Sequence, residues 1–182
     1  AAAFGLSISA MFAYISGSPF VLQEIYGVSP QQFSFLFGMN ALGIVITGQI
    51  NARLIGRVPL KRLLGGGILA STSGGILLLL TVAVLGGALP MVLISLFMVV
   101  ASLGFIMPNA TALALSAHPT TAGSASALLG LLQYLVGALA APLVGIGGED
   151  TALPMAVVIA TLGSSALIVY FLFVRGIPEP EE

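Results

Sequence analysis

The sequence has little charge and few of the side chains on which catalysis and metal binding usually depend. Of its 182 residues, 6% are charged and 58% are hydrophobic, whereas a soluble globular domain carries about 25% charged residues. Cysteine is absent and His118 is the only histidine, which excludes disulfides, thiolate metal sites and a histidine cluster. Five basic against six acidic side chains also exclude an electrostatic nucleic-acid binder. We therefore expect an integral membrane protein without a metal or a cofactor.

Six apolar segments separate the charged residues. Each is close to the roughly 20 residues with which an α-helix crosses a hydrocarbon layer about 30 Å thick, and none alternates as a transmembrane β-strand does. The sequence predicts an all-α membrane fold, a six-transmembrane-helix bundle over residues 1–175 followed by a cytoplasmic tail at 176–182. The expected spans are residues 4–22, 32–51, 63–85, 89–112, 122–146 and 152–174.

The basic residues predict the orientation of the bundle. Four of the five lie between the second and third expected spans, and the fifth, Arg175, follows the sixth span; the four are Arg53, Arg57, Lys61 and Arg62. Because cytoplasmic loops retain positive charge, we expect both ends of the chain to be cytoplasmic. Ala1 begins almost directly in a span without a basic leader, which favours a fragment of a longer chain over a signal peptide.

The expected spans contain no ionisable residue, so the neutral polar side chains are the candidates for a site. Asn40 and Gln133 fall near the middle of the second and fifth spans, where a carboxamide facing lipid would lose its hydrogen bonds. Each either bonds a neighbouring helix or lines a substrate cavity. Tyr14 either packs or offers a ring and a hydroxyl to a ligand. A proton-coupling carboxylate, if one is used, must lie outside these spans.

Two local patterns bear on helix packing. Gly123, Gly130 and Gly137 recur every seven residues in the fifth span, and such a small-residue stripe allows helix backbones to approach closely. In the fourth span Pro108 is expected to bend the helix. Asn109, beside it, either satisfies the freed carbonyl or borders the inner mouth of a cavity.

No arrangement typical of an enzyme is present. The sequence lacks a Gly-x-Ser-x-Gly elbow, and His118 sits beside Pro119 in a loop without a nearby acid. Asp150 is the only aspartate, so the paired aspartates of an intramembrane protease are missing. We expect no catalytic activity.

Several segments, taken together, resemble a known transporter family. FAYISGSPFVLQ at 12–23 with YGVSP at 26–30 resembles the seventh helix and outer loop of the bicyclomycin/chloramphenicol-resistance drug–proton antiporters, within the major facilitator superfamily. GFIMPNATALAL at 104–115 and AGSASALLGLLQY at 122–134 are similar to the tenth and eleventh helices of that subfamily. GQINARLIGR at 48–57 resembles a degenerate copy of the superfamily's Gly-x-Leu-Ala-Asp-Arg-x-Gly-Arg loop, without its aspartate and with an extra residue before Gly56.

The resemblance implies that this chain is the C-terminal six-helix half of a twelve-helix proton-driven exporter of small amphipathic compounds in a bacterial inner membrane. The N-terminal half, absent from this chain, would carry the proton-coupling acid. The two halves would hold the substrate between them near the midplane. A dedicated metabolite exporter and a non-transporting six-helix scaffold remain alternatives.

Under the transporter reading, particular residues of this half take particular roles. Phe37 lies nearly one turn from Asn40 and shares its face, so it joins the substrate wall. The four basic residues would contact an inner gate. The expected wall consists of Tyr14, Phe37, Asn40 and Gln133.

Overall fold

The computed structural model describes residues 2–116, 122–145 and 151–176, and within them it is a bundle of helices without strands. Six helical stretches are long and apolar enough to cross a membrane, which confirms the predicted fold class. The stretches are Ala2–Ile25, Pro30–Leu54, Leu60–Ala83, Leu89–Ser116, Ser126–Gly145 and Leu153–Val174. His118, Glu149, Asp150 and most of the tail lie outside the described residues.

Local sequence explains where several helices begin and end. Helix α1 (Ala2–Pro19) passes into a π-helical segment, Phe20–Ile25. Helix α2 (Pro30–Leu54) begins with a capping box. The backbone N–H of Gln32 donates to Ser29 Oγ at 3.3 Å, and the backbone N–H of Ser29 donates to Gln32 Oε1 at 3.0 Å. Helix α3 (Leu60–Ala83) ends in a tight hairpin at Gly86 and Gly87, whose φ values of +73° and +67° favour glycine.

The fourth span is interrupted at Ser102, six residues before Pro108. Helix α4 (Leu89–Ala101) and helix α5 (Leu103–Ser116) meet at Ser102, while α5 continues through Pro108. The Phe105 N–H donates to the Ser102 carbonyl at 3.0 Å, which leaves the Ala101 carbonyl to accept from Thr47 Oγ1 of α2 at 2.5 Å. The carbonyl freed at the interruption is therefore satisfied by a side chain from another helix.

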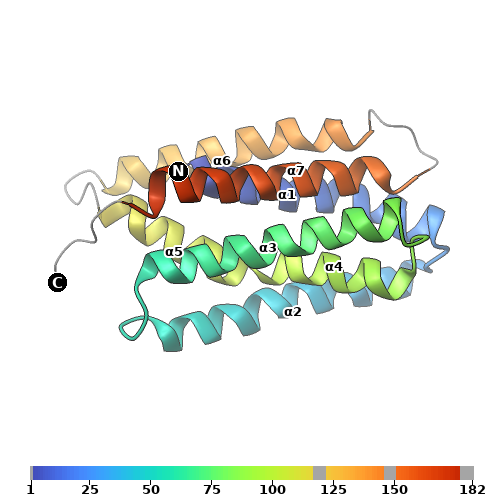
Figure 1. Cartoon of the computed structure of the whole chain (residues 1–182), viewed down its shortest axis with the longest axis horizontal. Helices are drawn as coiled ribbons and strands as arrows, with labels where there is room; N and C mark the ends of the chain where they lie inside the picture. The colour runs from blue at the N-terminus through green and yellow to red at the C-terminus, as the bar shows by residue number, and fades with distance from the viewer. Residues whose placement is uncertain (1, 117–121, 146–150, 177–182) are drawn as a thin grey trace.

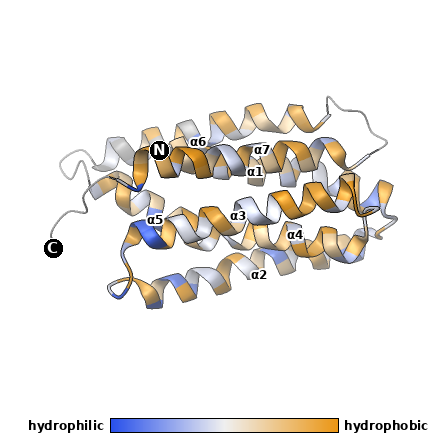
Figure 2. Cartoon of the chain, viewed as in Figure 1, coloured by the Kyte–Doolittle hydropathy of each residue, from blue (hydrophilic) through white to orange (hydrophobic). Residues whose placement is uncertain are grey.

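The remaining helices complete two packed groups. Helix α6 (Ala122–Gly145) and helix α7 (Leu153–Val169), which ends in the π-helical segment Tyr170–Val174, lie beside α1 on one side of the bundle. On the other side α3 packs on α4 and α5, which in turn contact α2 (Figure 1). All the expected cytoplasmic cations lie at one end, called here the basic end, where hydrophilic colour gathers near the α2–α3 loop (Figure 2).

Burial is uneven among the helices. The most apolar stretches of α1, α3 and α4–α5 have 50–56% of their residues buried, whereas α2 has 11% and α6 has 12%. The surfaces of α2 and α6 therefore have few partners within the described part of the chain. Their exposed side chains include the large hydrophobic residues Phe35, Val45, Leu131 and Leu139.

The glycine stripe of α6 packs at one position among the described residues. A Cβ added at Gly137 would overlap the ring of Phe12 on α1, whereas a Cβ at Gly123 or Gly130 would meet nothing within 4 Å. Gly137 thus sets the approach of α6 to α1.

Gly137→Ala is expected to loosen that approach. The alanine would push on the Phe12 ring, and overpacking of this kind destabilises by about 1–3 kcal/mol, so the full-length protein should unfold at a lower temperature. Gly130→Ala is the matched control, because its Cβ enters open space. Thermal stability in detergent is followed by size-exclusion chromatography; equal unfolding temperatures for the two variants would contradict the packing role of Gly137.

Candidate substrate site

Tyr14, Phe37 and Asn40 come together between α1 and α2. Asn40 Nδ2 donates to Tyr14 Oη at 2.8 Å, and the Tyr14 and Phe37 rings stack with centroids 5.9 Å apart and planes at 14°. Tyr14 is 2% and Asn40 8% exposed, but Phe37 is 41% exposed. The cluster therefore has a polar pair protected inside and an aromatic face open to an approaching molecule.

Gln133 lies apart from this cluster. It is half-buried on α6 and has no hydrogen-bond partner among the described residues. The next residue, Tyr134, meets Phe12 of α1 edge to face, with ring centroids 5.9 Å apart. Since Phe12 and Tyr14 are two residues apart on α1, they point in different directions around that helix. The structure thus brings three of the four expected wall residues together.

A pair of carboxamides, Asn51 and Asn109, lies buried toward the basic end. The sequence indicated Asn109 as a candidate but not its partner. Asn109 Nδ2 donates to Asn51 Oδ1 at 2.6 Å and lies 2.7 Å from the Phe105 carbonyl. Asn51 is 1% and Asn109 0% exposed, so Asn109 does not border a mouth within the described structure. Asn109 Oδ1 is buried without a partner among the described residues. Asn51 was visible only as part of the GQINARLIGR segment.

Leucine at either asparagine is expected to destabilise the protein more than leucine at both. Asn109→Leu leaves the buried Asn51 carboxamide without its described donor, and Asn51→Leu leaves Asn109 Nδ2 with the Phe105 carbonyl as its one described acceptor. Each loss costs up to about 1–3 kcal/mol, whereas replacing both partners by apolar groups can be nearly neutral. Unfolding temperatures of Asn51→Leu, Asn109→Leu and the double variant of the full-length protein form a double-mutant cycle. Strictly additive losses would show that the pair contributes no coupling.

The four basic residues differ in their surroundings. Arg53, Arg57 and Arg62 are exposed, while Lys61 is largely buried and its backbone carbonyl accepts from Tyr170 Oη at 2.9 Å. Helices α2 and α3 extend through Arg53, Lys61 and Arg62, so these cations sit in terminal turns rather than in the loop. Glu24 is the only carboxylate in the described part of the chain, and it lies in the last turns of the first span, at the opposite end.

Chemistry of other kinds finds no support in the described residues. No group of three His, Cys, Asp or Glu side chains within residues 2–116, 122–145 and 151–176 lies together in a way that could hold a metal ion. The polar side chains inside the helices are hydroxyls and carboxamides, which bind neutral groups by hydrogen bonds.

Comparison with known proteins gives the family. The family model described as Major Facilitator Superfamily matches residues 1–182. The chain is 42% identical over 158 residues to the uncharacterized MFS-type transporter YdgK of Bacillus subtilis, covering 85% of this chain and 39% of that protein. It is 33% identical over 175 residues to a bicyclomycin resistance protein homolog of Haemophilus influenzae, covering 94% of this chain and 43% of that protein. No solved structure matches.

Both the fold and the relatives identify an integral membrane protein of a transporter family, whose members are not enzymes. The chain spans about two fifths of the length of the curated relatives it matches. It belongs to the Major Facilitator Superfamily.

Proposed function

We propose that this chain is the C-terminal six-helix half of a secondary multidrug exporter, which moves small amphipathic compounds out of a bacterial cell in exchange for protons. Both ends of the segment lie in the cytoplasm in this proposal, with the basic end facing inward. Support comes from the coverage of the relatives, 39% and 43% of their length, and from the sparse burial of α2 and α6. The N-terminal half would cover part of these two helices.

The Tyr14–Asn40 pair with its Phe37 face is the observation that carries the substrate assignment. An aromatic face beside a protected hydroxyl–carboxamide pair suits a compound with an apolar ring and neutral polar groups. Phe37 is itself 6.0 Å from Phe33, centroid to centroid, so the aromatic surface continues along α2. Gln133 would join this wall from α6 as the two halves rock about the substrate.

The proton-coupling acid is assigned to the N-terminal half. Within the described helices the ionisable side chains other than tyrosine lie in terminal turns: Glu24, Arg53, Lys61 and Arg62. None of them is at the depth of Asn40. An intramembrane carboxylate is the usual proton relay of a membrane transporter, so this half would supply substrate contacts and, through its four basic residues, the inner gate.

The full-length protein in proteoliposomes tests the proposal. An imposed pH gradient should drive uptake of a neutral drug such as chloramphenicol into vesicles in which the basic end faces outward and the interior is acidic. Collapse of the gradient with a protonophore should abolish the uptake. Absence of gradient-dependent movement across a drug panel, with active protein orientation verified, would contradict drug export and favour a dedicated metabolite as substrate.

A further inference from the structure

The cations of the basic end have no carboxylate beside them in the described part of the chain. Glu24, the one carboxylate described, lies at the opposite end. Two of the cations come from adjacent helices: Lys61 is in the first turn of α3, and Arg175 directly follows the π-helical end of α7. Figure 2 shows hydrophilic colour at both of these helix ends. The charge of the pair is therefore open to an anion from outside the described residues.

Tyr170 joins the two helix ends. Its Oη donates to the Lys61 carbonyl at 2.9 Å, and its own carbonyl accepts from the backbone N–H of Arg175 at 3.0 Å. The second bond spans five residues, which is the spacing of a π-helix, so Arg175 lies about one turn beyond Tyr170. A Cβ added at Gly65, one turn after Lys61, would overlap the Tyr170 ring. The same tyrosine thus positions both cations.

The Lys61 side chain is enclosed although its charge is unpaired in the described structure. It is 9% exposed, whereas lysine is almost never this buried without a charged partner. Its aliphatic stem can pack on apolar neighbours while the ammonium reaches the surface. Because the stem is already ordered, an anion that binds the ammonium loses less free energy to side-chain ordering than it would at an exposed lysine.

The Arg175 side chain is held by an aromatic ring. Its guanidinium carbon lies 5.5 Å from the centroid of the Phe171 ring, and Phe171 in turn meets Tyr170 edge to face, with ring centroids 5.5 Å apart. A cation–π contact restricts the guanidinium through the π face of the ring and leaves its N–H donors for oxygen ligands. The planar donors of arginine match the oxygens of a phosphate group.

Exposed apolar side chains adjoin the two cations. Phe171, Leu172 and Phe173 are each at least half exposed at the end of α7, and α7 is not one of the helices that the N-terminal half is proposed to cover. An apolar surface that ends in a lysine and an arginine has the polarity of a membrane boundary. It fits a molecule with hydrocarbon chains and an anionic head.

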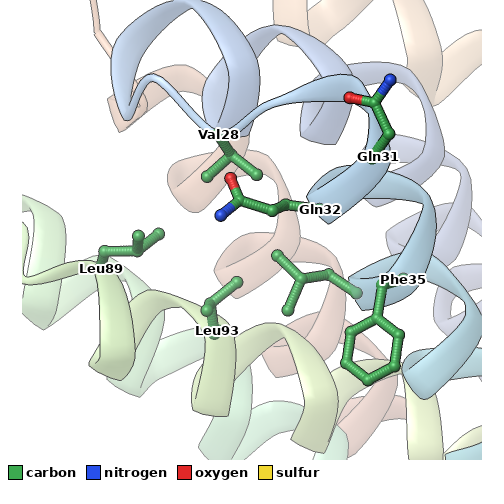
Figure 3. A pocket seen from close by; sticks show the side chains of 7 residues that line it. Val28, Gln31, Gln32, Phe35, Leu89 and Leu93 are labelled. Carbon is green, nitrogen blue, oxygen red and sulfur yellow. The ribbon is translucent and has the colours of Figure 1, made fainter.

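The opposite end of the bundle offers an anion no such partners within the described residues. The hollow between α2 and α4 near that end is lined by Gln31, Gln32 and apolar side chains such as Leu89 and Leu93, without a charged residue (Figure 3). Glu24 lies at the same end and would repel an anion. Charge complementarity therefore favours the basic end.

We propose that Lys61 and Arg175 form a binding site for the headgroup of an anionic phospholipid, whose phosphate bridges the ammonium and the guanidinium. The acyl chains of the lipid lie along Leu172 and Phe173. Under the orientation proposed above, this lipid belongs to the cytoplasmic leaflet, whose anionic lipids attract basic side chains near the membrane surface. The inference goes beyond drug export, because lipid binding is measured without a drug or a pH gradient.

Native mass spectrometry of the full-length protein in detergent, titrated with phosphatidylglycerol, gives the Kd of the lipid. Lys61→Gln and Arg175→Gln are each expected to raise this Kd about fivefold, which corresponds to about 1 kcal/mol per cation. Arg53→Gln is the matched control, because Arg53 is exposed in the last turn of α2 at the same end and the charge change is identical. Its Kd should stay within about twofold of the wild type. Equal effects of Arg53→Gln and Arg175→Gln would indicate diffuse attraction to the whole basic end and overturn the inference.

Further arms separate charge from packing and lipid from a soluble anion. Lys61→Arg keeps the charge and should bind the lipid within about threefold of the wild type, and Arg175→Gln, at an exposed position, remains informative if Lys61→Gln does not fold. Phosphatidylcholine, whose headgroup is neutral overall, should bind at least about fivefold more weakly; equal binding of the two lipids would contradict the site. Glycerophosphoglycerol, which is the headgroup without chains, should not displace the lipid at millimolar concentration. Displacement would assign the site to a soluble phosphate ester instead.

The carboxylates of the chain's own tail are the competing anions. Glu179, Glu181 and Glu182 follow Arg175 in the sequence and lie outside the described residues. Replacing all three by glutamine should leave the Kd of phosphatidylglycerol within about twofold. Lipid binding by this triple variant but not by the wild type would make the tail the occupant and overturn the inference.

Discussion

Gly104→Ala is expected to destabilise the protein by about 3 kcal/mol, at the upper end of what overpacking costs. A Cβ on Gly104 would lie 2.5 Å from the Ile44 carbonyl oxygen and 2.6 Å from the Gly48 amide nitrogen, and it would overlap Thr47 Oγ1. Two of these atoms belong to the backbone of α2, so no side-chain rotation relieves the contact. The helices must move apart, and this breaks the hydrogen bond from Thr47 to the Ala101 carbonyl.

Gly66→Ala is the matched control for that experiment. Gly66 is also inside a helix, but it is exposed and its Cβ would meet nothing within 4 Å. Alanine there should be neutral or stabilise the helix by up to about 1 kcal/mol. Full-length variants fused to a fluorescent reporter are compared by the fraction that remains monodisperse after heating. Equal melting of Gly104→Ala and Gly66→Ala would contradict the close crossing of α2 and α5.

Asn40→Leu is expected to lower drug transport by the full-length protein more than tenfold without removing the protein from the membrane. Leucine has a similar size, but it leaves the buried Tyr14 hydroxyl without its described donor, and it removes the carboxamide at the depth where we place the substrate. An unpaired buried polar group costs about 1–3 kcal/mol, and the loss of a ligand contact adds to it. The effect should be mainly on KM if Asn40 contacts the bound drug.

Two further variants separate a substrate contact from a structural one. Tyr14→Phe removes the hydroxyl but keeps the ring that stacks on Phe37, and we expect a loss of two- to tenfold, consistent with one hydrogen bond of about 0.5–1.5 kcal/mol. Gln49→Leu removes an exposed carboxamide from the same helix, and transport should stay within twofold. Initial rates over a range of drug concentrations, normalised to reconstituted protein, give KM and kcat. An unchanged KM and kcat in Asn40→Leu would refute the assignment of this wall.

The membrane-spanning elements were predictable because one physical requirement dominates them. A hydrocarbon layer tolerates a chain only as a helix that satisfies its own backbone, over about 20 apolar residues. The start of α2 is also a local feature, since Ser29 and Gln32 form a capping box around Pro30 and all three residues lie within one turn. The structure extends several helices a few residues past the expected spans, because terminal turns hold charged side chains such as Arg53 and Arg62 at the membrane surface.

The interruption of the fourth span at Ser102 could not be predicted from the residues around it. Pro108 is the residue that weakens a helix by its own structure, yet α5 passes through it. Ser102 has no such intrinsic property. Its turn is stabilised because Thr47, on another helix, supplies a donor to the Ala101 carbonyl. A contact between residues far apart in sequence cannot be read from either segment alone.

The candidate site likewise has a part that the sequence predicted and a part that depends on helix packing. Sequence spacing placed Phe37 and Asn40 on one face of a helix, and the depth of Tyr14 made it a possible neighbour. That Asn40 bonds Tyr14, while Asn51 bonds Asn109, depends on which helices pack together. Likewise an added Cβ would meet neighbouring atoms at Gly104 and Gly137 but not at Gly130.

The sequence by itself determined that this chain is a six-helix membrane bundle with its basic residues at one end, because hydropathy and charge act residue by residue against the bilayer. Only the tertiary structure decided which carboxamides pair, where the fourth span breaks and at which glycines an added Cβ would meet a neighbouring helix. Those outcomes follow from side-chain packing between helices, where a polar group without water must find its partner on whichever helix lies opposite.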